Sequence, residues 1–296
     1  MEYNEFLEEI IRYIKKQLDS ETRVSVTPVL KNNQSRTYSL TILKNGENMS
    51  PAIALNPYYA EYCHGAALEE LAEQILRVYQ ENHRSGRFDL SSYTDFSKVR
   101  DKIACKLVSY EKNQYLLSRV PHRRFLDLAI VYYYKMEDPI IGKASILIQN
   151  AHMELWNIEQ EVLEQLADEN TLRLLPFEFM GLEEMVKKIT GKDIVDPYPE
   201  LMKLYVLTNT EQHYGAVNMI FDSVLKEVYQ KLGEDFFLLP SSIHECMVLK
   251  AEEGVVPEIL QKIVAEINEE CVEDSEVLGT SVYRYDGKGG KLEIVR

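Results

Sequence analysis

The chain has 296 residues, of which 45% are hydrophobic and 27% charged, and its formal net charge is −15. The hydrophobic content is typical of a folded globular protein and excludes an intrinsically disordered chain. The acidic balance disfavours nucleic acid and anionic membrane surfaces as partners, because both attract clustered Lys and Arg.

Four cysteines are spread along the chain without any Cys-x-x-Cys pair. A secreted domain held by disulfides would be smaller and richer in cysteine, so we expect these thiols to be reduced. The segment Met1–Leu18 carries charges throughout, unlike a signal peptide. No run approaches the roughly 20 apolar residues of a membrane helix. We therefore expect a cytoplasmic protein without membrane association.

The N-terminal part, residues 1–120, is predicted to have the order α-β-β-β-α-α. Apolar residues recur at helical spacing in Tyr3–Leu18, and they alternate with polar residues in Val24–Leu30 and Tyr38–Ile42. The polar tract Lys31–Arg36 between these two strands predicts a hairpin connection. The further predicted elements are a strand over Ala52–Leu55, a helix beginning at Asn56-Pro57, a helix over Ala66–Tyr79 and a helix over Ser97–Tyr110.

The C-terminal part, residues 121–296, is predicted to repeat a strand–strand–helix pattern. The expected strands are Leu126–Tyr134, Ala144–Gln149, Lys203–Leu207, Ala216–Phe221, Phe236–Leu239, Cys246–Lys250, Ser281–Tyr285 and Leu292–Val295, with a turn at Asp138-Pro139. The expected helices are one capped by Asn157 that runs to Glu169, Leu182–Ile189, one from Asp222 to Gly233, and one opened by Pro257.

These patterns predict the α+β class, with mixed or antiparallel sheets and helices packed on them. From Ala216 to Tyr285 the expected order is β-α-β-β-α-β, as in a ferredoxin-like unit. The boundary between the two parts is expected near Arg119–Arg124, although the chain could also form one unit. A ferredoxin-like unit would not decide the function, because that fold serves many.

The first candidate site is the polar cluster from Ser241 to Glu245, in a predicted loop between two strands. His244 could act as a base for Ser241 or Ser242, oriented by a carboxylate, and Glu245 is the fourth candidate catalytic residue of the cluster. Residues so close in sequence seldom form a nucleophile–base pair, and no Gly-x-Ser-x-Gly elbow is present. The alternative is that the serines cap a turn and His244 bonds locally.

The second candidate is the segment Asn150–Trp156. In an extended chain, His152 and Glu154 would point to the same side and could bind a metal ion together with His244 or His64. No His-Glu-x-x-His or zinc-deaminase motif supports this hypothesis. The alternative is a turn that enters the helix capped by Asn157.

The third candidate is the basic run Arg119–Arg124, where Arg123 and Arg124 could bind a phosphate or carboxylate. The alternative is a solvated connection paired with surplus carboxylates. Nineteen tyrosines, with clusters at Tyr58-Tyr59 and Tyr132–Tyr134, are also compatible with a protein interface. Glycine-rich nucleotide motifs are missing, and no cofactor is implied.

Several stretches resemble an uncharacterised bacterial family, domain of unknown function 5688. They are Asn56–Tyr59, Phe125–Val131, Asn150–Trp156, Glu169–Thr171 with Leu175-Pro176, Leu207–Asn209 with Gly215-Ala216, and Pro240–Glu245. The resemblance covers nearly the whole chain, and Asn209 joins the candidate ligand-binding residues. It implies no activity, substrate or cofactor.

The leading hypothesis is a cytoplasmic binding or regulatory protein without catalysis, whose partner is another protein or a small molecule. The alternative is a metal-dependent or serine-based hydrolase that uses His152, Glu154 and the Ser241–Glu245 cluster. The hydrolase hypothesis requires His152 and His244 to converge in one pocket.

Overall fold

The computed structural model describes residues 1–30, 32–86, 94–138, 142–192, 203–252 and 255–295. The chain forms two compact units. Unit 1 comprises residues 1–31, 35–92 and 138–142, and unit 2 comprises residues 32–34, 93–137 and 143–296. The segment Arg119–Arg124, where we expected a boundary, lies inside unit 2. Pro139 of the expected turn lies outside the described residues.

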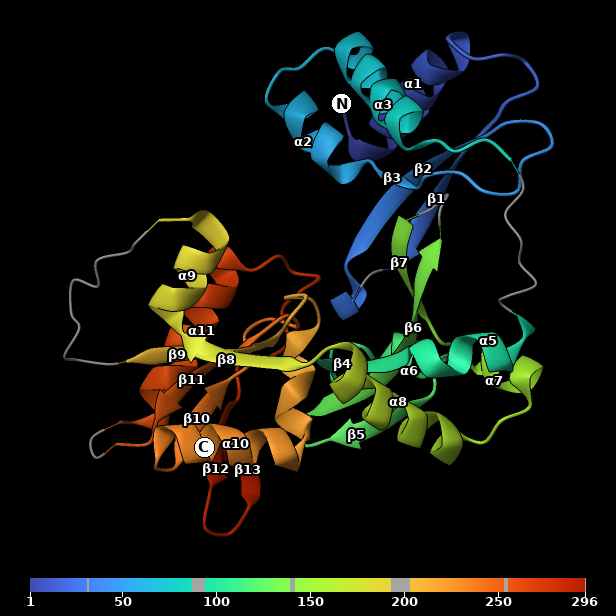
Figure 1. Cartoon of the computed structure of the whole chain (residues 1–296). Helices are drawn as coiled ribbons and strands as arrows, with labels where there is room; N and C mark the ends of the chain where they lie inside the picture. The colour runs from blue at the N-terminus through green and yellow to red at the C-terminus, as the bar shows by residue number, and fades with distance from the viewer. Residues whose placement is uncertain (31, 87–93, 139–141, 193–202, 253–254, 296) are drawn as a thin grey trace. The chain divides into compact units, whose positions relative to one another are not determined.

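Unit 1 is a three-stranded antiparallel sheet in the order β1-β2-β3, with α1 and α3 packed on one face (Figure 1). Its core lies between this sheet and the two helices, because their apolar faces have no other place to be buried. The predicted elements are confirmed, and their bounds are α1 (Tyr3–Lys16), β1 (Arg23–Leu30), β2 (Arg36–Leu43), β3 (Ile53–Ala54), α2 (Asn56–Cys63) and α3 (Leu68–Asn82). The connection η1 (Asn32–Gln34) follows β1 in the sequence but belongs to unit 2.

Unit 2 contains a four-stranded sheet in which β4 (Ile103–Ser109) and β5 (His122–Phe125) pair antiparallel with β6 (Leu128–Asp138). Strand β7 (Gly142–Leu147) also pairs with β6. The helical elements around this sheet are α5 (Phe96–Val99), η2 (Arg100–Lys102), α6 (Gln114–Leu117), α7 (Asn150–Trp156) and α8 (Gln160–Leu174).

The second sheet of unit 2 has six antiparallel strands in the order β13-β12-β10-β11-β9-β8. Its strands are β8 (Phe177–Gly181), β9 (Leu204–Asn209), β10 (Phe236–Leu239), β11 (Cys246–Lys250), β12 (Val282–Asp286) and β13 (Lys291–Val295). The connecting helices are α9 (Leu182–Thr190), η3 (Gly215–Ile220), α10 (Asp222–Leu232) and α11 (Pro257–Cys271).

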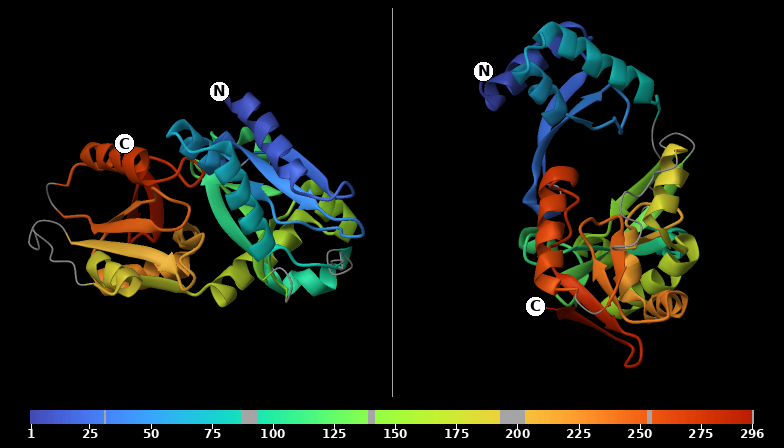
Figure 2. Two further views of the ribbon diagram at one scale, coloured as in Figure 1. Left: turned by 90° about the horizontal axis from the view of Figure 1, so that it is seen from above. Right: turned by 90° about the vertical axis from the view of Figure 1, so that its left-hand side faces the viewer.

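The helices cover both faces of the six-stranded sheet (Figures 1 and 2). Alternate residues of β10 point to opposite faces, so that Phe236 and Leu238 pack with α10 while Phe237 and Leu239 pack with α11. Helix α9 lies on the α11 face, where Lys188 pairs with Glu178 of β8.

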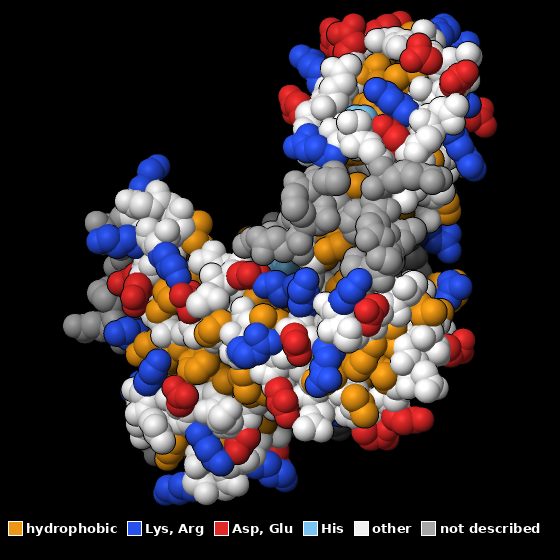
Figure 3. Space-filling model, turned by 45° about the vertical axis from the view of Figure 1, so that its right-hand side comes forward, with side chains coloured by type: hydrophobic (Ala, Val, Ile, Leu, Met, Phe, Trp, Pro, Cys, Tyr) orange, Lys and Arg blue, Asp and Glu red, His pale blue; other side chains and the backbone are white. Residues whose placement is uncertain are grey.

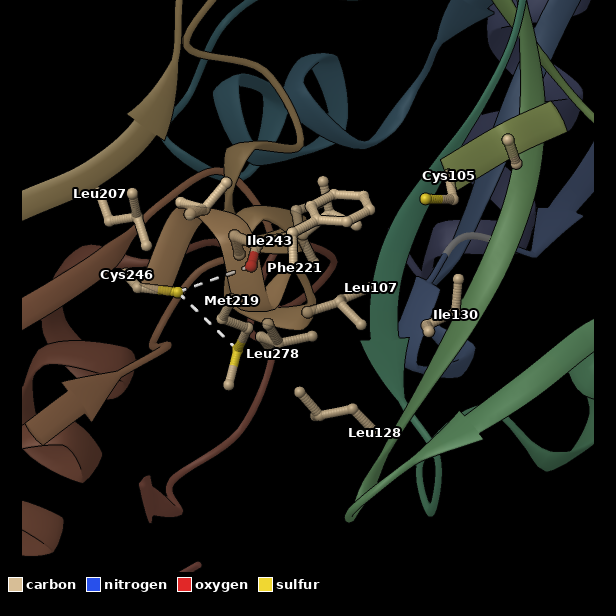
Figure 4. Close-up of a cluster of buried hydrophobic side chains, with 14 of the residues drawn as sticks. Cys105, Leu107, Leu128, Ile130, Leu207, Met219, Phe221, Ile243, Cys246 and Leu278 are labelled. Atoms are coloured by element: carbon tan, nitrogen blue, oxygen red, sulfur yellow. Dashed lines mark hydrogen bonds between the residues drawn. The ribbon is translucent and has the colours of Figure 1, made fainter. Parts of the chain in front are cut away.

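One hydrophobic core joins the two sheets of unit 2 (Figure 4). Leu107 of β4 and Ile130 of β6 face Met219 of η3 and Leu278, and the thiol of Cys246 lies 3.7 Å from the carbonyl oxygen of Ala216. These buried contacts hold the segment after β9 against β4. Figure 3 shows acidic and basic side chains interspersed over one face of the molecule.

The α+β class is confirmed, with all pairings whose direction is given being antiparallel. Three local predictions are wrong. The expected helix Ser97–Tyr110 contains strand β4, the expected strand Ala216–Phe221 is the 3-10 helix η3, and Asn157 is the left-handed C-cap of α7 rather than an N-cap. Strands β5 and β8 were not foreseen.

The ferredoxin-like prediction is also wrong in its details. With η3 in place of a strand, β9 becomes the first strand of the β-α-β-β-α-β series. In a ferredoxin-like sheet the fourth strand pairs with the first and both helices share a face. Here β12 pairs with β10, and α10 and α11 lie on opposite faces.

Within the ranges that the structure describes, we find no helix with the length and apolar character needed to cross a membrane.

Candidate functional site

The loop that follows β9, residues 209–215, presents an exposed histidine, His213, which the sequence analysis did not single out. The side chain of Asn209 is fully buried and organises this loop. Its Oδ1 accepts hydrogen bonds from the amides of Glu211 and His213, and its Nδ2 donates to the carbonyl oxygen of His213. Asn209, a candidate ligand-binding residue, is thus used within the protein.

The same loop contains two residues in the left-handed region, Gln212 at φ 53° and Tyr214 at φ 57°. This conformation is unfavourable for residues other than glycine, and such strain concentrates at functional sites. His213 lies between these two residues, and its backbone is held by the side chain of Asn209.

Gly215 ends the loop where only glycine fits. A Cβ atom there would lie 2.3 Å from Oγ1 of Thr208, 2.5 Å from the carbonyl oxygen of His244 and 2.8 Å from the amide nitrogen of Asn209. This close approach brings loop 209–215 against the loop after β10, which contains the Ser241–Glu245 cluster. Thr208 strengthens the junction by donating from its hydroxyl to the carbonyl oxygen of His244 at 2.9 Å.

The rings of His213, Tyr214 and His244 form one cluster. The His213 centroid lies 3.8 Å from that of Tyr214 and 5.0 Å from that of His244, and Tyr214 stacks on His244 with 8° between the planes. Nζ of Lys106 lies 4.0 Å from the centroid of the Tyr214 ring, and Tyr133 packs edge-on against the same ring. Residues from β4, β6 and two loops therefore converge here.

His213 also lines a cavity of about 600 Å³ in unit 2. The other lining residues are Lys102, Tyr133, Lys135, Met136, Ala144, Ser145, Leu174 and Glu211. This volume lies in the range of small-molecule sites. Partial desolvation, followed by the neighbouring His244 and the ammonium group of Lys106, lowers the pKa of His213 from its usual 6.5. At neutral pH its imidazole is therefore an uncharged hydrogen-bonding group.

His244, by contrast, has partners on both ring nitrogens. Its Nδ1 accepts a hydrogen bond from the amide of Tyr214 at 3.2 Å, which requires the ring proton to lie on Nε2. Nε2 in turn faces Oε1 of Glu276 at 3.3 Å. Neither nitrogen is paired with a serine hydroxyl in this arrangement.

Both serines of the cluster are buried, and the hydroxyl of Ser242 bonds to the backbone of its own loop. Oγ of Ser242 accepts a hydrogen bond from the amide of His244 at 2.9 Å, and the backbone oxygen of Ser241 accepts one from Leu278. Burial raises the pKa of Glu245, which also bonds to Ser242. These contacts are those of residues that cap a turn. They differ from the contacts of a serine nucleophile activated by a histidine base.

His152 lies in a different environment from His244. It is the third residue of α7, where Nδ1 accepts a hydrogen bond from the amide of Gln149, and its ring stacks on Trp156. Glu154 follows on the same helix, and residues two apart on a helix do not share a side. Asn150, the first residue of α7, contacts the carbonyl oxygen of Ser118 at 3.5 Å.

The opposite faces of β6 separate the two histidines. Tyr134 packs against Trp156, and the ring of His152 stacks on the same Trp156. The adjacent Tyr133 packs against Tyr214, and the ring of His244 stacks on the same Tyr214. Neighbouring strand residues point to opposite faces of the sheet. The structure thus does not bring His152 and His244 into one pocket. Within the described parts of the chain, no three His, Cys, Asp or Glu side chains are grouped to hold a metal ion.

The two arginine candidates are already engaged. Arg123 pairs with Asp168 at 3.0 Å and with Glu164 at 3.5 Å, both on α8. Arg124 lies 4.4 Å from the ring centroid of Tyr110 and donates to the carbonyl oxygen of Leu126. These contacts join β5 to its surroundings.

A family of unknown function, DUF5688, matches residues 3–287, and the chain belongs to this family. No curated protein and no solved structure is significantly similar to the chain. The family assignment agrees with the resemblance seen in the sequence and assigns no activity.

Proposed function

We propose that this protein is a cytoplasmic binding or regulatory protein that holds a small molecule in the His213 cavity of unit 2. The observation that carries the proposal is the convergence of a preorganised, strained histidine loop with a cavity of about 600 Å³. The polar groups on its wall come from separate elements, namely η2, β6, β7 and the loop after β9.

Binding has more support than catalysis because the groups around His213 form a recognition surface. Small-molecule sites typically combine an apolar lining with a few polar groups that orient the ligand. Tyr133, Met136 and Leu174 supply apolar area here, and Lys135 and His213 supply polar contacts. A serine-based hydrolase would need a free base beside Ser241 or Ser242, and His244 has its ring nitrogens bound elsewhere.

The proposal is tested by filling the cavity. Ala144 lines it and is half-buried, so Ala144→Phe should occlude the space while leaving the polar groups intact. A panel of small molecules would be screened for thermal stabilisation of the wild-type protein, since a ligand that binds only the folded state raises its stability. His213→Gln is the second variant, and the exposed His64→Gln in unit 1 is its matched control.

A hit should stabilise wild type and His64→Gln equally, and should lose most of its effect with Ala144→Phe and His213→Gln. Hits that stabilise all four proteins alike would place the ligand elsewhere and refute the proposed site. A panel with no hit, together with no change of melting temperature in Ala144→Phe, would also count against a functional cavity.

A further inference from the structure

The cavity beside His213 has an apolar floor. Tyr133 is almost completely buried, with 3% of its surface exposed, because it packs between Tyr214 and the core around Leu175. Met136 and Leu174 extend this apolar surface, and all three line the cavity. A ligand that fills the space must therefore bury a hydrophobic body against these side chains.

Two lysines lie on the cavity wall, and only one of them has an ion-pair partner among the described residues. Lys135 pairs with Glu211 at 2.6 Å, and both line the cavity. Lys102, at the end of η2, lines it without such a partner within the described ranges. The Lys135–Glu211 pair is neutral as a whole, so Lys102 leaves one positive charge uncompensated.

The remaining polar groups on the wall are uncharged. His213 is neutral at pH 7 as described above, and Ser145 of β7 offers a hydroxyl. Neutral imidazole and hydroxyl groups can each donate or accept a hydrogen bond. They orient a polar ligand group without adding charge, so the wall as a whole is positive by one unit in a chain whose net charge is −15.

We infer that the ligand of this cavity is a small organic monoanion, with an apolar or aromatic body and one carboxylate. The body lies on Tyr133, Met136 and Leu174, and the carboxylate faces Lys102. A phosphate dianion fits less well, because Glu211 remains in the wall and repels a second negative charge. This inference rests on the proposed function and names its ligand class.

The test compares three probes that share a phenyl body: phenylacetate, phenylacetamide and phenethylamine. Dissociation constants for the full-length protein would be measured by NMR titration, which detects weak binding. We expect the carboxylate to bind best, the amide to bind weakly and the amine to bind least, because Lys102 repels it. One partly exposed charge pair supports a preference of roughly fivefold for carboxylate over amide.

Lys102→Gln should weaken phenylacetate binding roughly fivefold and leave the amide unchanged. Lys288→Gln, at an exposed lysine in the β12–β13 turn, is the matched control and should change neither constant. Because Lys102 is exposed, its substitution is not expected to impair folding, and equal melting temperatures would verify this.

Three outcomes would overturn the inference. If amide and carboxylate bind equally, and Ala144→Phe abolishes both, the cavity binds small molecules without selecting an anion, so the proposed function stands and this inference fails. If phenylacetate binds but Lys102→Gln has no effect, Lys102 does not hold the carboxylate. Failure of all three probes refutes the monoanion class at this size, whereas a wider panel without a hit, together with an unchanged melting temperature in Ala144→Phe, counts against the proposed function itself.

Discussion

The backbone amide of Tyr214 donates a hydrogen bond to Nδ1 of His244, with 3.2 Å between the two nitrogens. Their rings also stack, with centroids 5.7 Å apart. This pair connects the loop after β9 to the loop after β10, so a substitution that moves one loop should also shift the other. The hydroxyl of Thr208 reaches the carbonyl oxygen of His244 and supports the same junction.

Gly215→Ala should destabilise the protein by about 1–3 kcal/mol or more, the usual range for overpacking a filled interior. The added methyl group would overlap Thr208 and two backbone groups, which cannot all move aside. Urea unfolding monitored by circular dichroism measures the change. Gly279→Ala is the matched control, since its Cβ would meet nothing closer than 4.0 Å. Equal stability of the two variants would contradict the close approach at Gly215.

His213 should make the stability of the protein depend on pH below neutrality. Partial desolvation, and then the neighbouring His244 and Lys106, lower the pKa of His213 below the 6.5 of the unfolded chain, although Glu211 and Glu276 partly oppose this. Between the lowered value and 6.5 the unfolded state binds more protons than the folded state, so stability falls as the pH drops through this window. Above 6.5 the contribution of His213 is fully retained.

Urea midpoints of wild type and His213→Gln between pH 5 and pH 8 would test this. The difference between the two proteins isolates the contribution of His213. Burial also lowers the pKa of His152, but His152 is present in both proteins and contributes equally to both curves. The variant should lose less stability on acidification. Parallel curves would show that the folded environment does not disfavour the imidazolium of His213.

Most helices and the hairpins could be predicted from local pattern, and the errors have a common cause. Val99, Ile103 and Leu107 are spaced four apart and indicated a helix, but Ala104, Cys105 and Val108 are also buried. Strand β4 is covered on both faces, so it lacks the alternation that marks a strand. Its identity depends on pairing with β6, which no local window contains.

The candidate site was harder to predict than the fold. Lys106, Tyr133, His213, His244 and Glu276 converge although they lie up to 170 positions apart in the sequence, as their numbers show. Of these, only His244 stood out by its polar neighbours. A signal for His213 did exist, because Asn209 and Gly215 on either side of it belong to the stretches that resemble the family. Neither residue indicated, without the fold, that a cavity lies beside the loop.

Arg123→Gln should lower stability without affecting ligand binding in the cavity. Its guanidinium joins β5 to Asp168 and Glu164 of α8, and 37% of the side chain is exposed, so solvent screening limits the loss to about 1 kcal/mol. The exposed Arg100→Gln, on η2, is the control and should change stability less. A binding defect in Arg123→Gln at unchanged stability would instead support the anion-binding hypothesis for this arginine.

Glu245→Gln should leave the protein as stable as wild type at pH 7, or more stable by about 1 kcal/mol, the scale for relieving one partly buried charge. Burial is the main reason that the pKa of Glu245 is raised, and Glu276 adds to it, while His244 and Ser242 oppose it. Between 4.5 and the raised value the folded state binds more protons than the unfolded state, so stability falls as the pH rises through this window. Glutamine is neutral throughout and removes that loss.

The advantage of Glu245→Gln should therefore disappear below about pH 4.5, where wild type is also protonated at this position. Glu276→Gln is the informative comparison, because it removes the carboxylate that faces Nε2 of His244 and should destabilise the protein instead. Denaturation at pH 4 and pH 7 distinguishes the two variants. If Glu245→Gln were less stable than wild type at pH 7, Glu245 would act as an anion that holds the cluster together. That result would support the hypothesis that the Ser241–Glu245 loop is a charged functional site.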